Sequence, residues 1–259
     1  MSFPKFGVAG ARSSAAALLC AAGLIGTALL LAQSPPIPKH GRAIFQFNGK
    51  DLSQFDTFLR NDGLNNDPTH VFTVENGSIH ASGTEMGYVI TKNEYKNYYL
   101  RAEFKWGEGT FGSRAGQARD GGILYNIQGP NHVWPRSIEF QINEGCTGDF
   151  WMTDGAALTG KDGVRVTGPA GKASKIDRFN KGPWKNVVGY RDPVNELEKP
   201  HGEWNVVELV NRGDGHIWQY VNGKLANEGT DAFPSSGKIL FQSEGAEIYY
   251  RDIRIYPLK

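Results

Sequence analysis

The feature that most constrains the fold is a strict alternation of apolar and polar side chains along residues 98–106. In the segment YYLRAEFKW, apolar residues occupy every second position from Tyr98 to Trp106, and Arg101, Glu103 and Lys105 lie between them. Successive side chains of a β-strand point to opposite faces of a sheet. The pattern therefore predicts a strand with one buried face and one solvated face.

Further short runs of strand character are separated by turn signals such as Asn76-Gly77 and Asn222-Gly223. The chain is rich in glycine, with 33 residues, and shows no amphipathic helical period. We expect an all-β fold, a two-sheet antiparallel β-sandwich of jelly-roll type. The remaining strands are predicted at residues 44–47, 71–75, 78–81, 88–91, 122–127, 137–142, 205–211, 216–222, 239–242 and 246–255.

Residues 153–203 break the strand rhythm with a long segment rich in glycine, lysine and proline. Long segments without regular structure in a compact domain usually carry function or mobility. We expect this segment to form loops over one rim of the sandwich, at the same end as the functional site.

The N-terminus is predicted to be an export segment. Lys5 and Arg12 precede an uncharged, apolar run that extends to Ala32. We expect residues 1–32 to be a signal peptide, although the run is also long enough to remain as a membrane anchor. Residues 33–42 form a proline-rich linker, and residues 43–259 form the folded domain. This organisation predicts a periplasmic or extracellular protein that meets a membrane only through an uncleaved N-terminal segment.

Charge and cysteine content exclude several classes of protein. The chain has 28 basic and 27 acidic residues, a formal net charge of +1, which argues against a nucleic-acid partner. Removal of residues 1–32 would leave Cys146 as the last cysteine, so no internal disulfide is expected. No paired-cysteine or HExxH spacing predicts a zinc site.

The segment SIEFQINE at residues 137–144 is the most informative for chemistry. Glu139 and Gln141 share one face of a predicted strand, and the opposite face carries Ile138, Phe140 and Ile142. A carboxylate and an amide in mid-strand are costly to bury without partners, so their face is either solvent-exposed or a ligand cleft. Glu144 would face the other way in a regular strand, but one β-bulge would bring it round. Two carboxylates on one face suit acid–base work on a sugar, whereas ordinary ion pairs on a solvated face remain the alternative.

The spacing Glu139-x-Gln141-x-x-Glu144 resembles the catalytic strand of laminarinase- and lichenase-type glucanases, which have a jelly-roll fold. Those enzymes have an aspartate between the two glutamates, and Gln141 stands in its place here. The two-carboxylate retaining mechanism is therefore not predicted from this resemblance.

A second resemblance extends over nearly the whole of the predicted domain. Motifs in order along the chain are FNGKDL at 47–52, FTVENG at 72–77, LRAEF at 100–104, DGGI at 120–123, IEFQI at 138–142, GEWN at 202–205, VNG at 221–223, ILFQ at 239–242 and YRDI at 250–253. In this order the chain resembles the 3-keto-disaccharide hydrolase family, also described as 3-keto-glucoside lyase/hydratase domains, of concanavalin A-like fold.

That resemblance implies a cleft on a concave sheet, with Glu139 and Gln141 in the family's Glu-x-Gln position. A 3-keto group acidifies the hydrogen on C2 of the sugar, so a carboxylate base can start elimination of the C1 substituent, and water can then add back. We expect Glu139 to be the base that matters most, with Glu144 less important. Asp120 stands where the family often has asparagine, and we keep it as a further catalytic candidate.

Several residues are candidates for holding substrate. The enolate would need donors or a cation, which Arg101, Arg119, Arg136, His132 or a divalent metal could supply. Tryptophan stacks well on sugar rings, and Trp134 and Trp151 flank the Glu139 strand; Gln242 lies in a family motif. We expect Arg101 and Glu103 to lie beside Glu139 on a neighbouring strand.

No cofactor is required by the sequence, but a Ca²⁺ site could be formed by four carboxylates. Its ligands would be Asp120, Glu139, Glu144 and Asp149. The sequence thus predicts an exported enzyme that hydrolyses or eliminates and hydrates 3-keto-glycosides, with a carbohydrate as its partner. The alternatives are a non-catalytic carbohydrate-binding module on the same scaffold, a conventional glycosidase or an adhesion domain.

Overall fold

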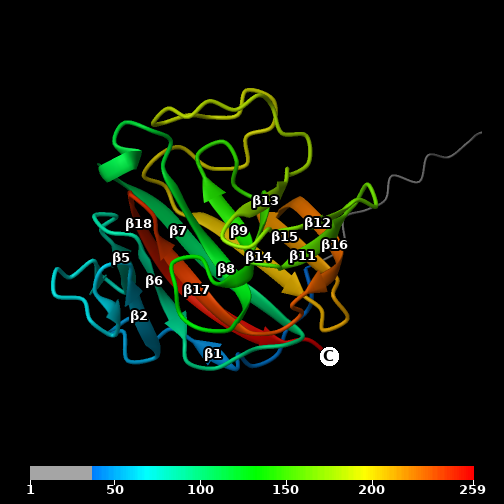
Figure 1. Ribbon diagram of the computed structural model, residues 1–259, viewed down its shortest axis with the longest axis horizontal. Coiled ribbons are helices and arrows are strands. Elements are labelled where there is room, and N and C mark those ends of the chain that lie inside the picture. The colour runs from blue at the N-terminus through cyan, green and yellow to red at the C-terminus, as the bar shows by residue number, and fades with distance from the viewer. Residues whose placement is uncertain (1–36) are drawn as a thin grey trace, which may run out of the picture. The chain divides into compact units, whose positions relative to one another are not determined.

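Two antiparallel β-sheets form the domain in the computed structural model, which describes residues 37–259 (Figure 1). This architecture confirms the predicted all-β sandwich of jelly-roll type. The predicted signal peptide or anchor at 1–32, and the start of the predicted linker, lie outside the described residues. Within residues 37–259, no helix is long and apolar enough to span a membrane.

The larger sheet contains ten strands. Its order is β12 (Arg165–Thr167), β11 (Ala157–Gly160), β16 (Lys224–Phe233), β15 (Ile217–Val221), β14 (Asn205–Asn211), β7 (Tyr98–Thr110), β18 (Ala246–Pro257), β5 (Ser78–Ala81) and β4 (Phe72–Glu75), with β1 (Phe45–Gln46) also paired to β18. The second sheet has eight strands, in the order β13 (Ala173–Ile176), β10 (Phe150–Thr153), β9 (Arg136–Asn143), β8 (Asp120–Gln128), β17 (Lys238–Ser243), β6 (Gly87–Thr91), β2 (Phe55–Leu59) and β3 (Gly63–Leu64).

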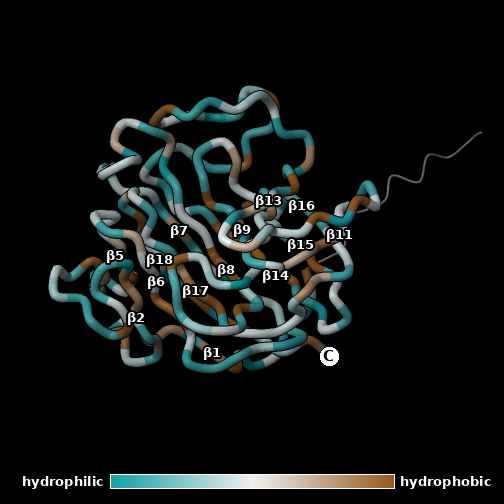
Figure 2. Tube along the Cα trace, viewed as in Figure 1, coloured by the Kyte–Doolittle hydropathy of each residue, from teal (hydrophilic) through white to brown (hydrophobic). Residues whose placement is uncertain are grey.

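The core lies between the two sheets and follows the alternation seen in the sequence. On β7 the side chains of Leu100, Ala102 and Phe104 are fully buried, whereas Arg101 and Glu103 lie on the outer face in ion pairs. On β9 the core-facing residues are Ile138, Phe140 and Ile142, as predicted. Figure 2 shows the hydrophobic positions concentrated on the strands and the connecting loops mostly hydrophilic.

The prediction for residues 153–203 is partly wrong, because this segment contains β11, β12 and β13 as well as loops. These short strands lack a clear alternation in sequence. They form because established strands offer them free edges: β11 pairs with β16, and β13 pairs with β10. The rest of the segment, residues 177–204, connects β13 to β14 without a strand.

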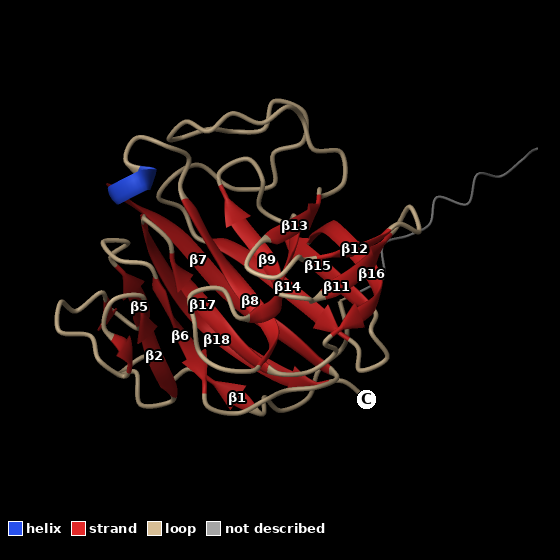
Figure 3. Cartoon of the chain, viewed as in Figure 1, coloured by secondary structure: helices blue, strands red, loops and turns tan. Residues whose placement is uncertain are grey.

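The single helical element of the described residues is the short 3-10 turn η1 (Gly112–Arg114), between β7 and β8 (Figure 3). The described part of the chain begins with residues 37–43, which pack on the outer face of the ten-stranded sheet. Ile37 and Ala43 contact a hydrophobic cluster there, and the ring of His40 lies 3.8 Å from that of Tyr256. The second half of the predicted linker is therefore attached to the domain.

Candidate active site

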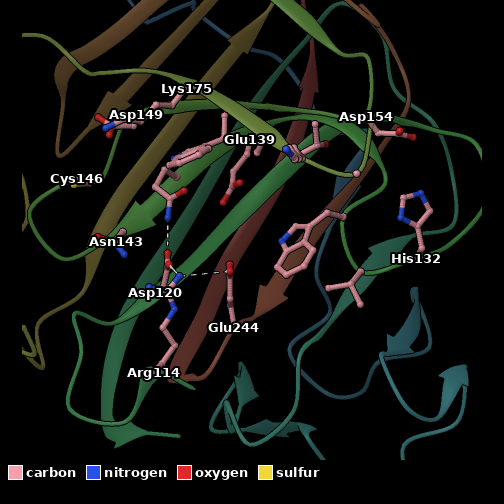
Figure 4. Close-up of a pocket in the computed structure, with 18 of the residues that line it drawn as sticks. Arg114, Asp120, His132, Glu139, Asn143, Cys146, Asp149, Asp154, Lys175 and Glu244 are labelled. Carbon is pink, nitrogen blue, oxygen red and sulfur yellow. Dashed lines mark hydrogen bonds and ion pairs between the residues drawn. The ribbon is translucent and has the colours of Figure 1, made fainter. Parts of the chain in front are cut away.

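A cavity of about 590 Å³ lies on the face of the eight-stranded sheet that points away from the core. Its floor is formed by β8, β9, β10 and β13, and its walls by loops (Figure 4). Six of the predicted site residues line it, namely Asp120, His132, Trp134, Glu139, Gln141 and Trp151.

The alternation along β9 places its polar residues in this cavity. Glu139, Gln141 and Asn143 follow each other at every second position and all line the cavity. The pairing of β9 with β8 is regular from Ile138 to Asn143, which lies opposite Asp120. On the other side, Trp151 of β10 lies opposite Glu139, so a tryptophan and a carboxyl group stand next to each other.

Three carboxyl groups and one guanidinium form a cluster at one end of the cavity, which we call the carboxylate cluster: Asp120, Glu139, Glu244 and Arg114 (Figure 4). Asp120 forms an ion pair with Arg114 and accepts hydrogen bonds from the amide of Gln141 and, at 3.1 Å, from the backbone N–H of Gly121. Arg114 also lies 3.7 Å from Glu244. Burial raises the pKa of Asp120, but these donors hold its carboxyl group in place, which suits a structural role better than proton transfer.

Glu139 differs from Asp120 because its buried carboxyl group lacks donors. The residue is 6% exposed, and its Oε1 atom has no hydrogen-bond partner among the described residues. Burial, and then the nearby charges of Glu244 and Asp120, raise the pKa of Glu139 well above its ordinary value, against the effect of Arg114. Burial and the charge of Asp120 likewise raise the pKa of Glu244, to about 8.

Replacement of Glu244 tests this electrostatic arrangement through stability. An unfolded glutamate ionises near pH 4.5, whereas folded Glu244 holds its proton up to about pH 8. Between these values the folded state binds more protons, so stability falls as the pH rises. The free energy of unfolding of the parent should therefore fall between pH 5 and pH 8. We expect this fall to be smaller by about 2 kcal/mol in Glu244→Gln, a figure that allows for the coupling of Glu244 to its neighbours.

Thermal melting at half-unit pH steps would measure this effect. The matched control is Glu203→Gln, which replaces an exposed glutamate and should keep the slope of the parent protein. If plots of Tm against pH were parallel for the parent and Glu244→Gln, the pKa of Glu244 would not be raised.

Aromatic side chains form the walls of the cavity. Trp134 and Trp184 are each 39% exposed and line its rim, together with the half-buried Trp151. Trp184 lies in the connection between β13 and β14. Its indole N–H donates to the backbone carbonyl of Glu144 at 3.0 Å, and this hydrogen bond fixes the position of the ring. Thr153, Asp154, Lys172, Lys175 and Trp184 all come from residues 153–203, so the predicted position of that segment at the site end is confirmed.

Glu144 lies outside the cavity, since no bulge turns it toward Glu139. Its buried carboxylate accepts from the guanidinium of Arg119 at 2.8 Å and from the backbone N–H of Gly189 at 2.7 Å. Arg119, a candidate for enolate stabilisation, is thereby occupied as well. The pair fastens the loop that carries Trp184 to the end of β9.

The expectation that Arg101 and Glu103 lie beside Glu139 is wrong. Strand β7 pairs with β14 and β18, so these residues belong to the other sheet, where Arg101 forms ion pairs with Glu103 and Asp252. Arg136 lies outside the cavity lining, where its Nε donates to the carbonyl of Asp154 at 2.9 Å. Gln242 is buried on β17, on the other side of β8 from Glu139, and does not line the cavity.

The four carboxylates of the predicted Ca²⁺ site do not converge. In residues 37–259 there is no group of three or more His, Cys, Asp or Glu side chains arranged to hold a metal ion. Asp149 lines the cavity but forms an ion pair with Lys181 at 2.6 Å, and Glu144 is held by Arg119. Cys146 also lines the cavity, and burial raises the pKa of its thiol to about 12, so a thiolate nucleophile is disfavoured.

Arg114, Asn143 and Glu244 are polar or charged residues near Glu139 and Gln141 that were not predicted from the sequence. Two of them could have been found, because Asn143 continues the alternation from Gln141, and Glu244 lies two positions after Gln242. Arg114 gave no signal, since it lies on a short turn that only the fold brings to the cavity.

The structure is thus a jelly-roll sandwich with carboxyl groups and tryptophans in a cavity on one sheet. The chain belongs to the family of 3-keto-alpha-glucoside-1,2-lyase-like domains, whose model matches residues 43–256. This confirms the family resemblance drawn from the motifs.

Three solved structures are similar to this chain, and the first of them supports the fold. A protein from Parabacteroides distasonis ATCC 8503, described as a candidate glycosyl hydrolase, is 21% identical with a TM-score of 0.51, covering 82% of this chain and 92% of that chain. A second such protein from that organism is 21% identical with a TM-score of 0.46, covering 74% and 93%. The carbohydrate-binding module CBM66 from Bacillus subtilis is 10% identical with a TM-score of 0.44, covering 69% and 86%. No curated protein matches the sequence.

Proposed function

We propose that this protein is an exported carbohydrate-active enzyme that cleaves 3-keto-glycosides by elimination followed by hydration, with Glu139 and Glu244 as an acid–base pair. One observation carries the proposal: a buried carboxyl group without partners, Glu139, lies beside a second carboxyl group in a cavity walled by tryptophans. The membership of the family supports the substrate class.

The two carboxyl groups suit the two proton transfers of the elimination. Burial and the charge of Asp120 raise the pKa of Glu244 to about 8, and Arg114 opposes them by favouring the ionised form. The ionised form of Glu244 can therefore remove the acidified hydrogen from C2, and the rate of this step should rise toward pH 8. Glu139 forms no ion pair among the described residues, and burial raises its pKa well above the ordinary value, so it can protonate the aglycone oxygen as the C1–O bond breaks. The sugar product then carries a double bond between C1 and C2, conjugated with the ketone.

Hydration reverses the two roles and restores the enzyme. Glu139, now ionised, takes a proton from water as the water oxygen bonds to C1, and Glu244 returns its proton to C2. The net reaction converts a 3-keto-glycoside and water into a 3-keto-sugar and a free aglycone. Glu139 is thus the acid of the first step and the base of the second, and the sequence predicted only the base role.

The remaining cavity residues suit binding of the sugar. Trp151 lies opposite Glu139 across the β9–β10 ladder, where a sugar ring could stack on the indole close to the carboxyl group. The guanidinium of Arg114 is the cation of the carboxylate cluster and would offset negative charge that develops on the enolate oxygen.

Purified protein incubated with a 3-keto-glucoside, and separately with the unoxidised parent glucoside, tests this function. We expect release of aglycone from the keto form alone. Binding of either sugar without turnover would instead favour a carbohydrate-binding module, and cleavage of the parent glucoside would favour a conventional glycosidase. Export is tested by N-terminal sequencing of the mature protein recovered from outside the cytoplasm, with a start near residue 33 expected.

A further inference from the structure

Two buried oxygen atoms converge next to the carboxylate cluster, and neither accepts a hydrogen bond from the described residues. Oε1 of Glu139 and Oε1 of Gln242 both lack a hydrogen-bond partner among the described residues. The two residues are 6% and 3% exposed. An unsatisfied acceptor in such a place costs about 1–3 kcal/mol, so two together require an explanation.

Gly122 allows the two side chains to meet. It lies opposite Gln141 on β8, with Glu139 reaching from β9 on one side and Gln242 from β17 on the other. A Cβ atom on Gly122 would lie under 3.0 Å from both Oε1 atoms, so the two oxygens converge over the same backbone position. The backbone of Gly122 is outside the left-handed region, so its lack of a side chain, and not its conformation, is what the site uses.

Two acceptor oxygens that converge in a buried place repel each other unless the carboxyl group carries a proton or the amide turns its NH2 group toward the carboxyl group. An amide oxygen cannot be protonated near neutral pH, whereas a carboxyl group can. The groups that face Glu139 also favour the acid: Glu244 and Asp120 are carboxyl groups, Tyr125 and Tyr250 are neutral, and Arg114 alone opposes.

We propose that Gln242 is a positioning residue that holds Glu139 as a hydrogen-bond-donating carboxylic acid, with the Glu139 O–H donating to the Gln242 amide oxygen over Gly122. This inference rests on the proposed function and deepens it. In the elimination step the Glu139 carboxyl group turns about its terminal bond, so that the O–H leaves Gln242 and faces the cavity. The proton then moves to the aglycone oxygen as the C1–O bond breaks, which leaves Glu139 ionised and the aglycone as a neutral alcohol.

The dependence of rate on the leaving group tests this role. An alkyl aglycone needs a proton to depart, whereas 4-nitrophenol departs as a stable anion and needs little help from an acid. We therefore compare kcat/KM for methyl and 4-nitrophenyl 3-keto-glucosides in the parent protein, Gln242→Leu and Gly122→Ala. We expect both variants to lose at least about 10-fold more on the methyl substrate than on the 4-nitrophenyl one. Because the two rates are measured on one preparation, an unfolded fraction cancels in their ratio.

Gln128→Leu is the matched control, since it makes the same change at an exposed position of β8 and should keep the parent ratio. An unchanged ratio in both test variants, whether their rates are retained or fall equally, would overturn the proposal. If the parent protein releases neither aglycone, the proposed function fails as well.

A spectroscopic measurement is independent of turnover. Infrared spectra at pH 7 should show the carbonyl stretch of a buried carboxylic acid that shifts in D₂O. We expect this band to be lost in Glu139→Gln and displaced in Gln242→Leu. A parent spectrum from which Glu139→Gln removes no such band would mean that Glu139 is ionised, and would overturn the inference even for an active enzyme.

Discussion

A Glu139→Gln variant is expected to lose at least about 10²-fold in kcat/KM on an alkyl 3-keto-glucoside, the low end for removal of a general acid or base. Glutamine keeps the shape of the side chain but cannot supply the proton or take one from water. The position is fixed by the core neighbours Ile138 and Phe140, so the cavity should keep its form. The fold should also persist, since the substitution removes no ion pair of Glu139 in the described structure.

The measurement is the initial rate of aglycone release, together with a melting curve for each preparation. Glu144→Gln is the comparison, because its carboxyl group lies outside the cavity, and we expect it to cost less turnover. If Glu139→Gln retained the parent rate with unchanged melting, the acid–base role would pass from Glu139 to Glu244 or Asp120.

The largest effect on stability is expected from Arg119→Met. This change leaves the carboxylate of Glu144 buried without its guanidinium, and breaking one partner of a buried ion pair costs about 3–5 kcal/mol. In a domain of this size, that loss corresponds to a fall in Tm of about 10 °C. Chemical denaturation of the variant and the parent would measure this loss. The comparison requires that the free energy of unfolding depends on denaturant with the same slope in both proteins.

A double variant separates loss of the pair from loss of packing. Arg119→Met with Glu144→Gln removes both charges, so it should recover a substantial part of the stability lost by Arg119→Met alone. The amide can still accept a hydrogen bond from the backbone of Gly189, as the carboxylate does. If the double variant were as unstable as the sum of the single variants, the two side chains would not be coupled.

Local pattern was sufficient to predict much of the fold. The alternation along β7 and β9 identified both strands and their buried faces, because a side-chain period of two is a local property of extended backbone. Strands β2, β3, β10 to β13 and β16 were missed. Their sequences show weak alternation, and they are held by pairing with strands distant in the sequence, such as β16 with β11.

The residues of the site likewise include some that local pattern predicted and some that it did not. Glu139 and Gln141 were predicted to share a face, and Trp134 and Trp151 to lie near it, and all four line the cavity. The second carboxyl group was predicted to be Glu144, but regular pairing to the end of β9 turns it toward Arg119, and Glu244 of the turn after β17 lies in the cavity instead.

By itself, then, the sequence determined the all-β class, the family, and the polar face of β9, since each depends on residue type and near-neighbour spacing. Only the tertiary structure decided that β7 lies in the opposite sheet from Glu139, that Arg114 serves the carboxylate cluster, and that Gln242 meets Glu139 over Gly122. These arrangements depend on which strands pair across long stretches of chain. The energy of such pairing depends on both strands together, and the sequence of one strand does not identify its partner.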